Sequence, residues 1–88
     1  MNRYRSRLQI IRDVLLIVDS KNGSKKTHIL YGANFSHRLL TSYLAVIINA
    51  GLLQYDGESY RITEKGRMFR KLYETYEKNC KELEEHQK

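Results

Sequence analysis

The sequence has no proline, a single cysteine and no long apolar segment. Because Cys80 stands alone, it cannot close an intrachain disulfide or supply a thiolate-rich zinc site, so we expect a reduced, intracellular protein without a metal. The longest apolar stretch, residues 14–18, is far shorter than the ~20 residues that span a membrane, and no signal-peptide pattern is present. These absences favour a small globular protein.

A length of 88 residues allows one domain with a modest core. Such a chain buries only ~60% of its unfolded surface, so a partner chain would add stability. Hydrophobic residues make up 41% and charged residues 30%, which is too apolar for a disordered chain. No linker, low-complexity segment or internal repeat divides it.

Positive charge is in excess and is unevenly distributed. The formal net charge is +6, with thirteen basic and five acidic side chains in residues 1–71 and three basic and five acidic ones in residues 72–88. A positive body with a slightly acidic tail is typical of a nucleic-acid-binding protein. The alternative is that the charge, at a pI of 9.6, serves solubility alone.

Three helices are expected in the first half of the chain. Apolar residues at helical spacing predict a helix over residues 4–20, at Leu8, Ile11, Leu15 and Val18. Residues 21–23 end it, and Ser24 is the expected N-cap of a short second helix that residues 32–34 end. Ser36 caps a third helix whose apolar face carries Leu40, Tyr43, Leu44, Ile47 and Ile48.

A β-hairpin and a long helix are expected in the second half. Residues 52–55 and 59–62 read as short strands joined by Asp56-Gly57, a strong hairpin signal. Thr63 caps a last helix that no proline interrupts. The expected fold is therefore α+β but mostly α: a winged helix-turn-helix of three helices and a two-stranded wing, with a long C-terminal helix. Residues 1–66 form the winged domain, and residues 67–88 a dimerisation helix of the same folding unit.

Two motifs carry a resemblance to a known family. Ile29-Leu-Tyr-Gly-Ala-Asn-Phe-Ser36 precedes the third helix, and Tyr60-Arg-Ile-Thr-Glu-Lys-Gly66 follows the wing. With Tyr43-Leu44 and Gly51-Leu52, they resemble the archaeal winged-helix proteins typified by the small ten-kilodalton DNA-binding protein of Sulfolobus, and the wider ArnR-like domains. The resemblance covers about residues 8–75. It implies DNA binding without catalysis, and a dimer held by an antiparallel coiled coil of the last helices.

The sequence departs from that family pattern in three places. Gly32 stands where members often carry a longer, frequently basic side chain, and Ala45-Val46 replaces a more polar stretch. The wing tip, Asp56-Gly57-Glu58, is acidic where phosphate contact favours Lys or Arg. This last departure argues against a contact between the wing and DNA, or confines that contact to Arg61 at the base of the wing.

The candidate DNA-binding residues lie mainly on the third helix and just before the second. Arg38 has the geometry to read guanine, and hydroxyl side chains reach base edges or phosphates. Lys25 and Lys26 stand where helix N–H groups favour an anion, although solvated lysines explain them nearly as well. The predicted set is Lys25, Lys26, Thr27, Ser36, His37, Arg38, Thr41, Ser42 and Arg61, with an arm of Arg3, Arg5 and Arg7 that is alternatively a frayed terminus.

The last helix carries an apolar stripe with a seven-residue repeat. We expect it to form the seam of a short coiled coil between two copies of the chain. The alternative is a helix folded back onto the first helix. The predicted dimerisation residues are Phe69, Leu72, Tyr73, Tyr76, Cys80 and Leu83.

The sequence thus predicts a homodimeric protein that binds double-stranded DNA as a transcription regulator or an architectural protein of the nucleoid, in the cytoplasm. No nucleophile elbow, phosphate loop or metal-ligand spacing appears, so we expect no enzyme, no cofactor, no metal and no membrane partner. A winged-helix module that binds proteins is the alternative. Binding of single strands through tyrosines is less favoured, because Tyr31, Tyr43 and Tyr60 are expected in the core.

Overall fold

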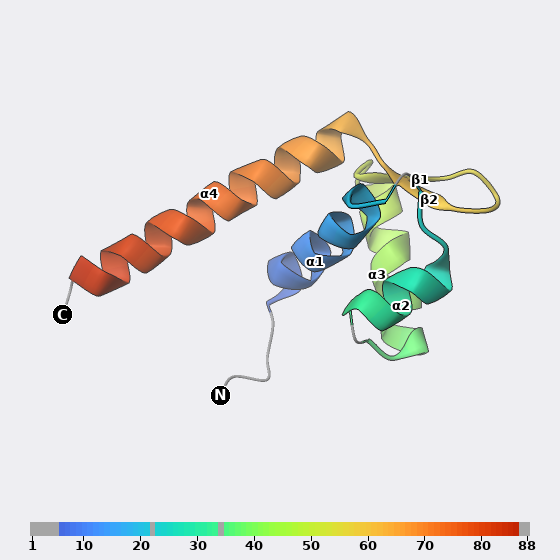
Figure 1. Ribbon diagram of the computed structural model, residues 1–88, viewed down its shortest axis with the longest axis horizontal. Coiled ribbons are helices and arrows are strands. Elements are labelled where there is room, and N and C mark those ends of the chain that lie inside the picture. The colour runs from blue at the N-terminus through green and yellow to red at the C-terminus, as the bar shows by residue number, and fades with distance from the viewer. Residues whose placement is uncertain (1–5, 22, 34, 87–88) are drawn as a thin grey trace.

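The computed structural model describes residues 6–21, 23–33 and 35–86. Figure 1 shows the expected order of elements: three helices, a hairpin and a long helix. They are α1 (Arg7–Asp19), α2 (Lys26–Ala33), α3 (His37–Asn49), β1 (Leu53–Tyr55), β2 (Tyr60–Ile62) and α4 (Glu64–His86). The predicted fold class, a mostly helical winged helix-turn-helix, is confirmed.

Helix α1 begins at a capping box that the sequence analysis overlooked. The Ser6 hydroxyl accepts a hydrogen bond from the Gln9 N–H at 3.1 Å, and the Gln9 side chain accepts one from the Ser6 N–H at 2.8 Å. Because these bonds satisfy N–H groups that the helix leaves open, they fix its start at Arg7, later than expected. After the helix, Gly23 adopts a φ of +103°, as its position in the turn requires.

The prediction that Ser24 caps α2 is wrong. Ser24 instead pairs with Tyr60 of β2, through N–H to carbonyl bonds of 2.9 and 2.7 Å in the two directions. Its side chain is buried, and Oγ has no hydrogen-bond partner among the described residues. This bridge adds one residue to the outer edge of the hairpin and ties the loop after α1 to the wing.

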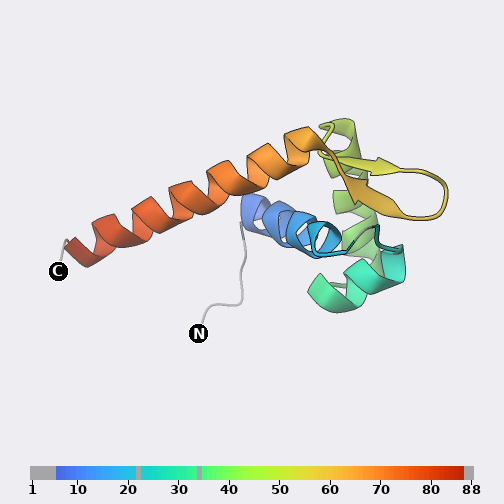
Figure 2. The ribbon, with the colours of Figure 1, turned by 45° about the horizontal axis from the view of Figure 1, so that its top comes forward.

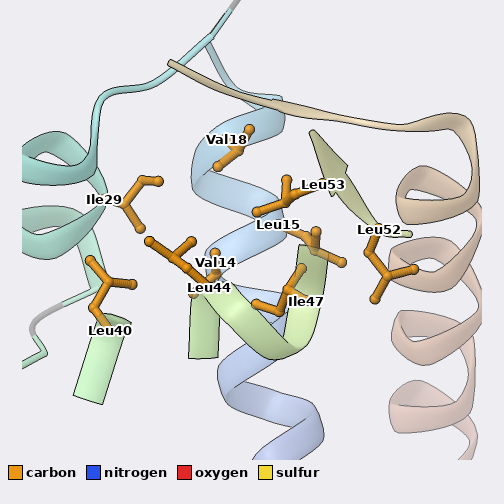
Figure 3. Packing of buried hydrophobic residues seen from close by; sticks show 9 residues of the cluster. All are labelled: Val14, Leu15, Val18, Ile29, Leu40, Leu44, Ile47, Leu52 and Leu53. Atoms are coloured by element: carbon orange, nitrogen blue, oxygen red, sulfur yellow. The ribbon is translucent and has the colours of Figure 1, made fainter. Parts of the chain in front are cut away.

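One core unites α1, α2, α3 and the base of the wing (Figure 3). Helix α1 lies at its centre, Leu53 lies beside α1, and Leu52 lies beside α4. The buried residues are Val14, Leu15, Val18, Ile29, Leu40, Leu44, Ile47, Leu52 and Leu53. Since α3 contributes only one face to this core, its other face is left exposed.

The junction between β2 and α4 explains the sequence Thr63-Glu-Lys-Gly66. Thr63 Oγ1 accepts a hydrogen bond from the Gly66 N–H at 3.0 Å and donates one to the Gly51 carbonyl at 2.6 Å. Lys65 Nζ donates to the Ala50 carbonyl at 2.8 Å, a favourable place for a cation at the end of α3. A Cβ on Gly66 would overlap the carbonyl oxygen of Leu52. These contacts hold the start of α4 against the end of α3.

Helix α4 runs antiparallel to α1 and extends past it (Figures 1 and 2). Near its start, Arg67 and Arg70 pair with Asp19 at the end of α1, at 3.3 and 3.2 Å. Further along, Glu77 lies 3.8 Å from Arg12 and accepts a 3.3 Å hydrogen bond from Gln9. One side of α4 therefore packs on its own chain. None of the helices in the described part of the chain is long and apolar enough to cross a membrane.

Gly66→Ala is expected to lower the free energy of unfolding by about 1–3 kcal/mol, because the added methyl overlaps a backbone carbonyl that cannot move without distorting the junction. Gly32→Ala in α2 is the matched control. Its methyl would meet the end of the flexible Ile17 side chain at 3.1 Å, and alanine favours a helix. Chemical denaturation measures both. A Gly66 variant as stable as the Gly32 variant would contradict the close approach.

Candidate nucleic-acid interface

The exposed face of α3 is the largest part of the predicted site. Ser36 caps the helix by accepting a 3.1 Å hydrogen bond from the Leu39 N–H, so its hydroxyl is engaged in the helix end. His37, Arg38, Thr41 and Ser42 are all exposed, as predicted. The face carries three further exposed residues that the sequence analysis did not assign: Leu39, Val46 and Asn49. We call the exposed face formed by these seven residues and Ala45 the α3 strip: His37, Arg38, Leu39, Thr41, Ser42, Ala45, Val46 and Asn49.

Spacing on the helix would have found the missed residues. Asn49 and Val46 stand seven and four positions after Ser42, so they share its side of the helix. Val46 is 42% exposed and Leu39 40% exposed, and an apolar side chain here suits the methyl group of thymine. An asparagine pairs with adenine through two hydrogen bonds. The strip therefore offers guanine, adenine and thymine contacts, but only one firm positive charge, on Arg38.

Lys26 brings a second charge to the strip from α2. Its Nζ donates a 2.6 Å hydrogen bond to Thr41 Oγ1, and Thr41 donates a 2.9 Å bond to the His37 carbonyl. Because the two residues are fifteen positions apart, no local pattern predicts this contact. The ammonium group keeps two further N–H donors for a phosphate beside α3.

For the other predicted residues that the structure describes, it shows exposure but no hydrogen bond to the α3 strip. Lys25 and Thr27 are exposed at the start of α2, where backbone N–H groups favour an anion. Arg7 is exposed in the first turn of α1. Arg3 and Arg5 lie outside the described residues.

Asp56 at the acidic wing tip stabilises the turn of the hairpin. Asp56 Oδ1 accepts hydrogen bonds of 2.9 Å from the N–H groups of both Glu58 and Ser59, and Gly57 adopts a φ of +95°. The bonds from Ser59 and Glu58, helped by Arg61, lower the pKa of Asp56 below its usual range. Glu58 is exposed at the tip. The wing therefore needs Asp56 for its shape, whatever its tip contacts.

Arg61 stands on β2 opposite Gln54, with about half of its side chain exposed. Its Nε lies 3.5 Å from Asp56 Oδ2, a weak surface pair that a phosphate can replace. Tyr55 and Tyr60 stack at 4.5 Å on the neighbouring pair of the hairpin and stiffen it. Arg61 is thus held on a firm strand at the base of the wing.

Helix α4 divides the six predicted dimerisation residues between two sides. Phe69 packs against the core. Tyr73 and Cys80 are half-buried, and each follows by three positions a residue that faces α1, Arg70 or Glu77. Leu72, Tyr76 and Leu83 are 68%, 59% and 63% exposed, and Met68 beside them is 60% exposed. A hydrogen bond with Cys80 raises the pKa of Tyr76. We call Met68, Leu72, Tyr76 and Leu83 the outer strip of α4.

No group of three or more His, Cys, Asp or Glu side chains suited to a metal ion occurs among the residues that the structure describes. What the structure does assemble is a mostly polar helix face, a cation of α2 bound to it, a second, exposed cation just before α2, and Arg61 at the base of the wing. All of these are groups that contact nucleic acid in folds of this kind.

Comparison with known proteins identifies the family to which the chain belongs. A family model described as "winged helix-turn-helix" matches residues 4–81, and the chain belongs to this family. Over 78 residues it is 35% identical to an uncharacterized protein of Methanocaldococcus jannaschii, a match that covers 85% of this chain and 78% of that protein. The structure of the present chain is similar to the crystal structure of Sso10a-2, a DNA-binding protein from Sulfolobus solfataricus. The TM-score is 0.81 and the sequence identity 25%, and the match covers 94% of this chain and 90% of the other. The resemblance to the archaeal family is confirmed.

Proposed function

We propose that the protein binds double-stranded DNA as a homodimer, with α3 of each protomer in a major groove. The observation that carries the proposal is the α3 strip, an exposed and mostly polar helix face that has Lys26 of α2 bound to it and the wing following α3 in the chain. A major groove ~12 Å wide admits such a helix. The similar Sulfolobus protein is described as DNA-binding, which supports the same activity here.

Binding is expected to depend mostly on phosphates. Lys26 contacts the first half of α3, Lys25 directly precedes Lys26, and Arg61 stands on the wing, so these cations can add phosphate contacts to those of α3. Within the strip, Arg38 and Asn49 are the two side chains with strong base-pairing geometry. A protein with few base-reading groups discriminates weakly among sequences, which favours an architectural role in the nucleoid over control of a single operator.

The outer strip of α4 supports the dimer. Its members follow one another at intervals of four, four and seven residues, which keeps them on one side of the helix. Each is more than half exposed although large and apolar, and Asn79 falls on the same side. A second α4 packed against this side would bury the strip, and the antiparallel coiled coil implied by the family resemblance is the arrangement that we propose.

A protein-binding winged helix is the second candidate. The observation that favours it is the exposed apolar surface near the helix-turn-helix, where Tyr31 is 82% exposed in addition to Leu39 and Val46. This exposure also overturns the expectation that Tyr31 belongs to the core. Binding of random-sequence duplex DNA at low salt separates the two candidates, since a module that binds only proteins would not retain the duplex.

Arg38→Ala tests the placement of α3. If Arg38 reads a guanine, the variant should lose about 1–3 kcal/mol of binding free energy on the preferred duplex and relax the preference at one base pair. Fluorescence anisotropy on a panel of duplexes measures this, with Lys81→Ala on the far part of α4 as the control for lost charge. An equal loss on all sequences would make Arg38 a phosphate contact. An unchanged affinity would show that the α3 strip does not face DNA.

The dimer is tested by placing charges on the outer strip. Leu72→Glu with Leu83→Glu should give a monomer, because two glutamates per helix would meet like charges and lose their apolar contacts in a coiled coil. Both positions are exposed in the protomer, so folding should be unaffected. Lys78→Glu with Lys81→Glu, a larger change of charge on another side of α4, is the control. Light scattering that gives the native and the doubly substituted protein the same mass would contradict the proposal.

A further inference from the structure

A second cluster of cations lies where the loop after α1, strand β2 and the beginning of α4 meet, at the base of the wing (Figure 1). Lys21, Arg61 and Arg67 come from these three elements and line one pocket with Gly23 and Ile62. The pocket has a volume of about 170 Å³, many times the ~10–15 Å³ that one water molecule requires. It shares no residue with the α3 strip.

The fold brings these three cations together through contacts distant in sequence. The Ser24–Tyr60 bridge holds the loop after α1 beside β2, and the locked junction at Gly66 sets the direction of α4. The Lys21 backbone N–H donates to the Val18 carbonyl at 3.3 Å, but the side chain of Lys21 makes no hydrogen bond or ion pair with the described residues. Arg67 uses only its Nε to contact Asp19, at 3.3 Å, and is more than half exposed. Both side chains therefore have donors available at the pocket.

Glycine at position 23 keeps the pocket open. A Cβ there would lie 3.3 Å from Ser59 Oγ, a tight contact, and 3.5 Å from Arg61 Cζ, an ordinary van der Waals contact. The φ of +103° disfavours other residues as well. A side chain at position 23 would therefore occupy part of the pocket that Gly23 lines with Lys21 and Arg61.

The balance of charge favours an anion in the pocket. Asp56 and Asp19 pair with Arg61 and Arg67, but Asp19 is also held by Arg70, and Asp56 is held by the N–H groups of the wing turn. Three cations that approach from three elements match the tetrahedral oxygens of a phosphate better than the plane of a carboxylate. Arginine forks are also well suited to phosphate oxygens.

We propose that Lys21, Arg61 and Arg67 form a binding site for a phosphate group, which is either a backbone phosphate of nucleic acid or a free phosphate ion. The first source would add a contact to the duplex beyond those of α2 and α3. The second would make the wing base a ligand site. The site itself does not depend on DNA binding by α3.

Titration of the full-length protein with sodium phosphate at constant ionic strength tests the site. Two-dimensional ¹⁵N–¹H spectra follow the Gly23 amide and the Nε–H groups of Arg61 and Arg67. We expect saturable shifts confined to these groups and their neighbours, with no such shifts when sodium chloride replaces phosphate. Lys21→Gln should weaken the apparent affinity about tenfold, as the loss of one charge-assisted hydrogen bond predicts. The control Lys81→Gln removes the same charge elsewhere and should change nothing.

The source of the phosphate is decided with a short duplex. If the pocket takes a backbone phosphate, Lys21→Gln should make the dependence of log affinity on log salt shallower by about 0.9 for each pocket engaged. If the pocket takes only free phosphate, the shifts persist and that slope equals the native one. Absent shifts, shifts spread over the whole surface, or shifts that are unchanged in Lys21→Gln would overturn the site. A failure to bind any duplex would instead count against the proposed function, since the phosphate titration uses no DNA.

Discussion

The close approach of Gly66 to the carbonyl of Leu52 sets the arrangement of the elements around it. Because α4 begins directly against the end of α3, the chain must leave the core there in a fixed direction. Thr63 and Lys65 tie the same corner through carbonyls that α3 leaves open at its end. The wing projects on one side of this corner and α4 on the other (Figure 2). The α3 strip, the wing and the outer strip of α4 therefore keep fixed positions relative to one another.

Charge is divided between holding the fold and facing outward. Asp19 and Glu77 form ion pairs between α1 and α4, and Glu74 lies 3.4 Å from Arg70. Part of the acidic charge in the C-terminal segment is therefore paired within the protein. Arg70, which belongs to the same network, is mostly covered, whereas Lys25, Arg38 and Lys21 remain exposed. Positive charge is consequently exposed on the helix-turn-helix and at the base of the wing.

Local signals were sufficient for most of the fold. Serine, threonine and glycine at helix ends, and Asp-Gly in the hairpin, act through neighbouring backbone groups, so Ser36, Thr63 and Gly57 were assigned correctly. Ser24 was misassigned because its partner Tyr60 is distant in the sequence, and pairing across the wing prevails over a cap. The Lys26–Thr41 contact and the pocket at Lys21 depend on the same kind of distant packing. Along α4, the apolar stripe was clear, but only the packing of α1 shows which half of it is already covered.

The central claim is that this surface binds duplex DNA chiefly through phosphates. The most direct measurement is the affinity of the native protein for a duplex at increasing salt, because each neutralised phosphate releases condensed counterions and contributes about −0.9 to the slope of log affinity against log salt. Three contacts per protomer, drawn from Lys25, Lys26, Arg38, Arg61 and the amino-terminal arm, predict a slope near −5 for the proposed dimer, at about −0.9 per contact. A slope close to zero would contradict the account.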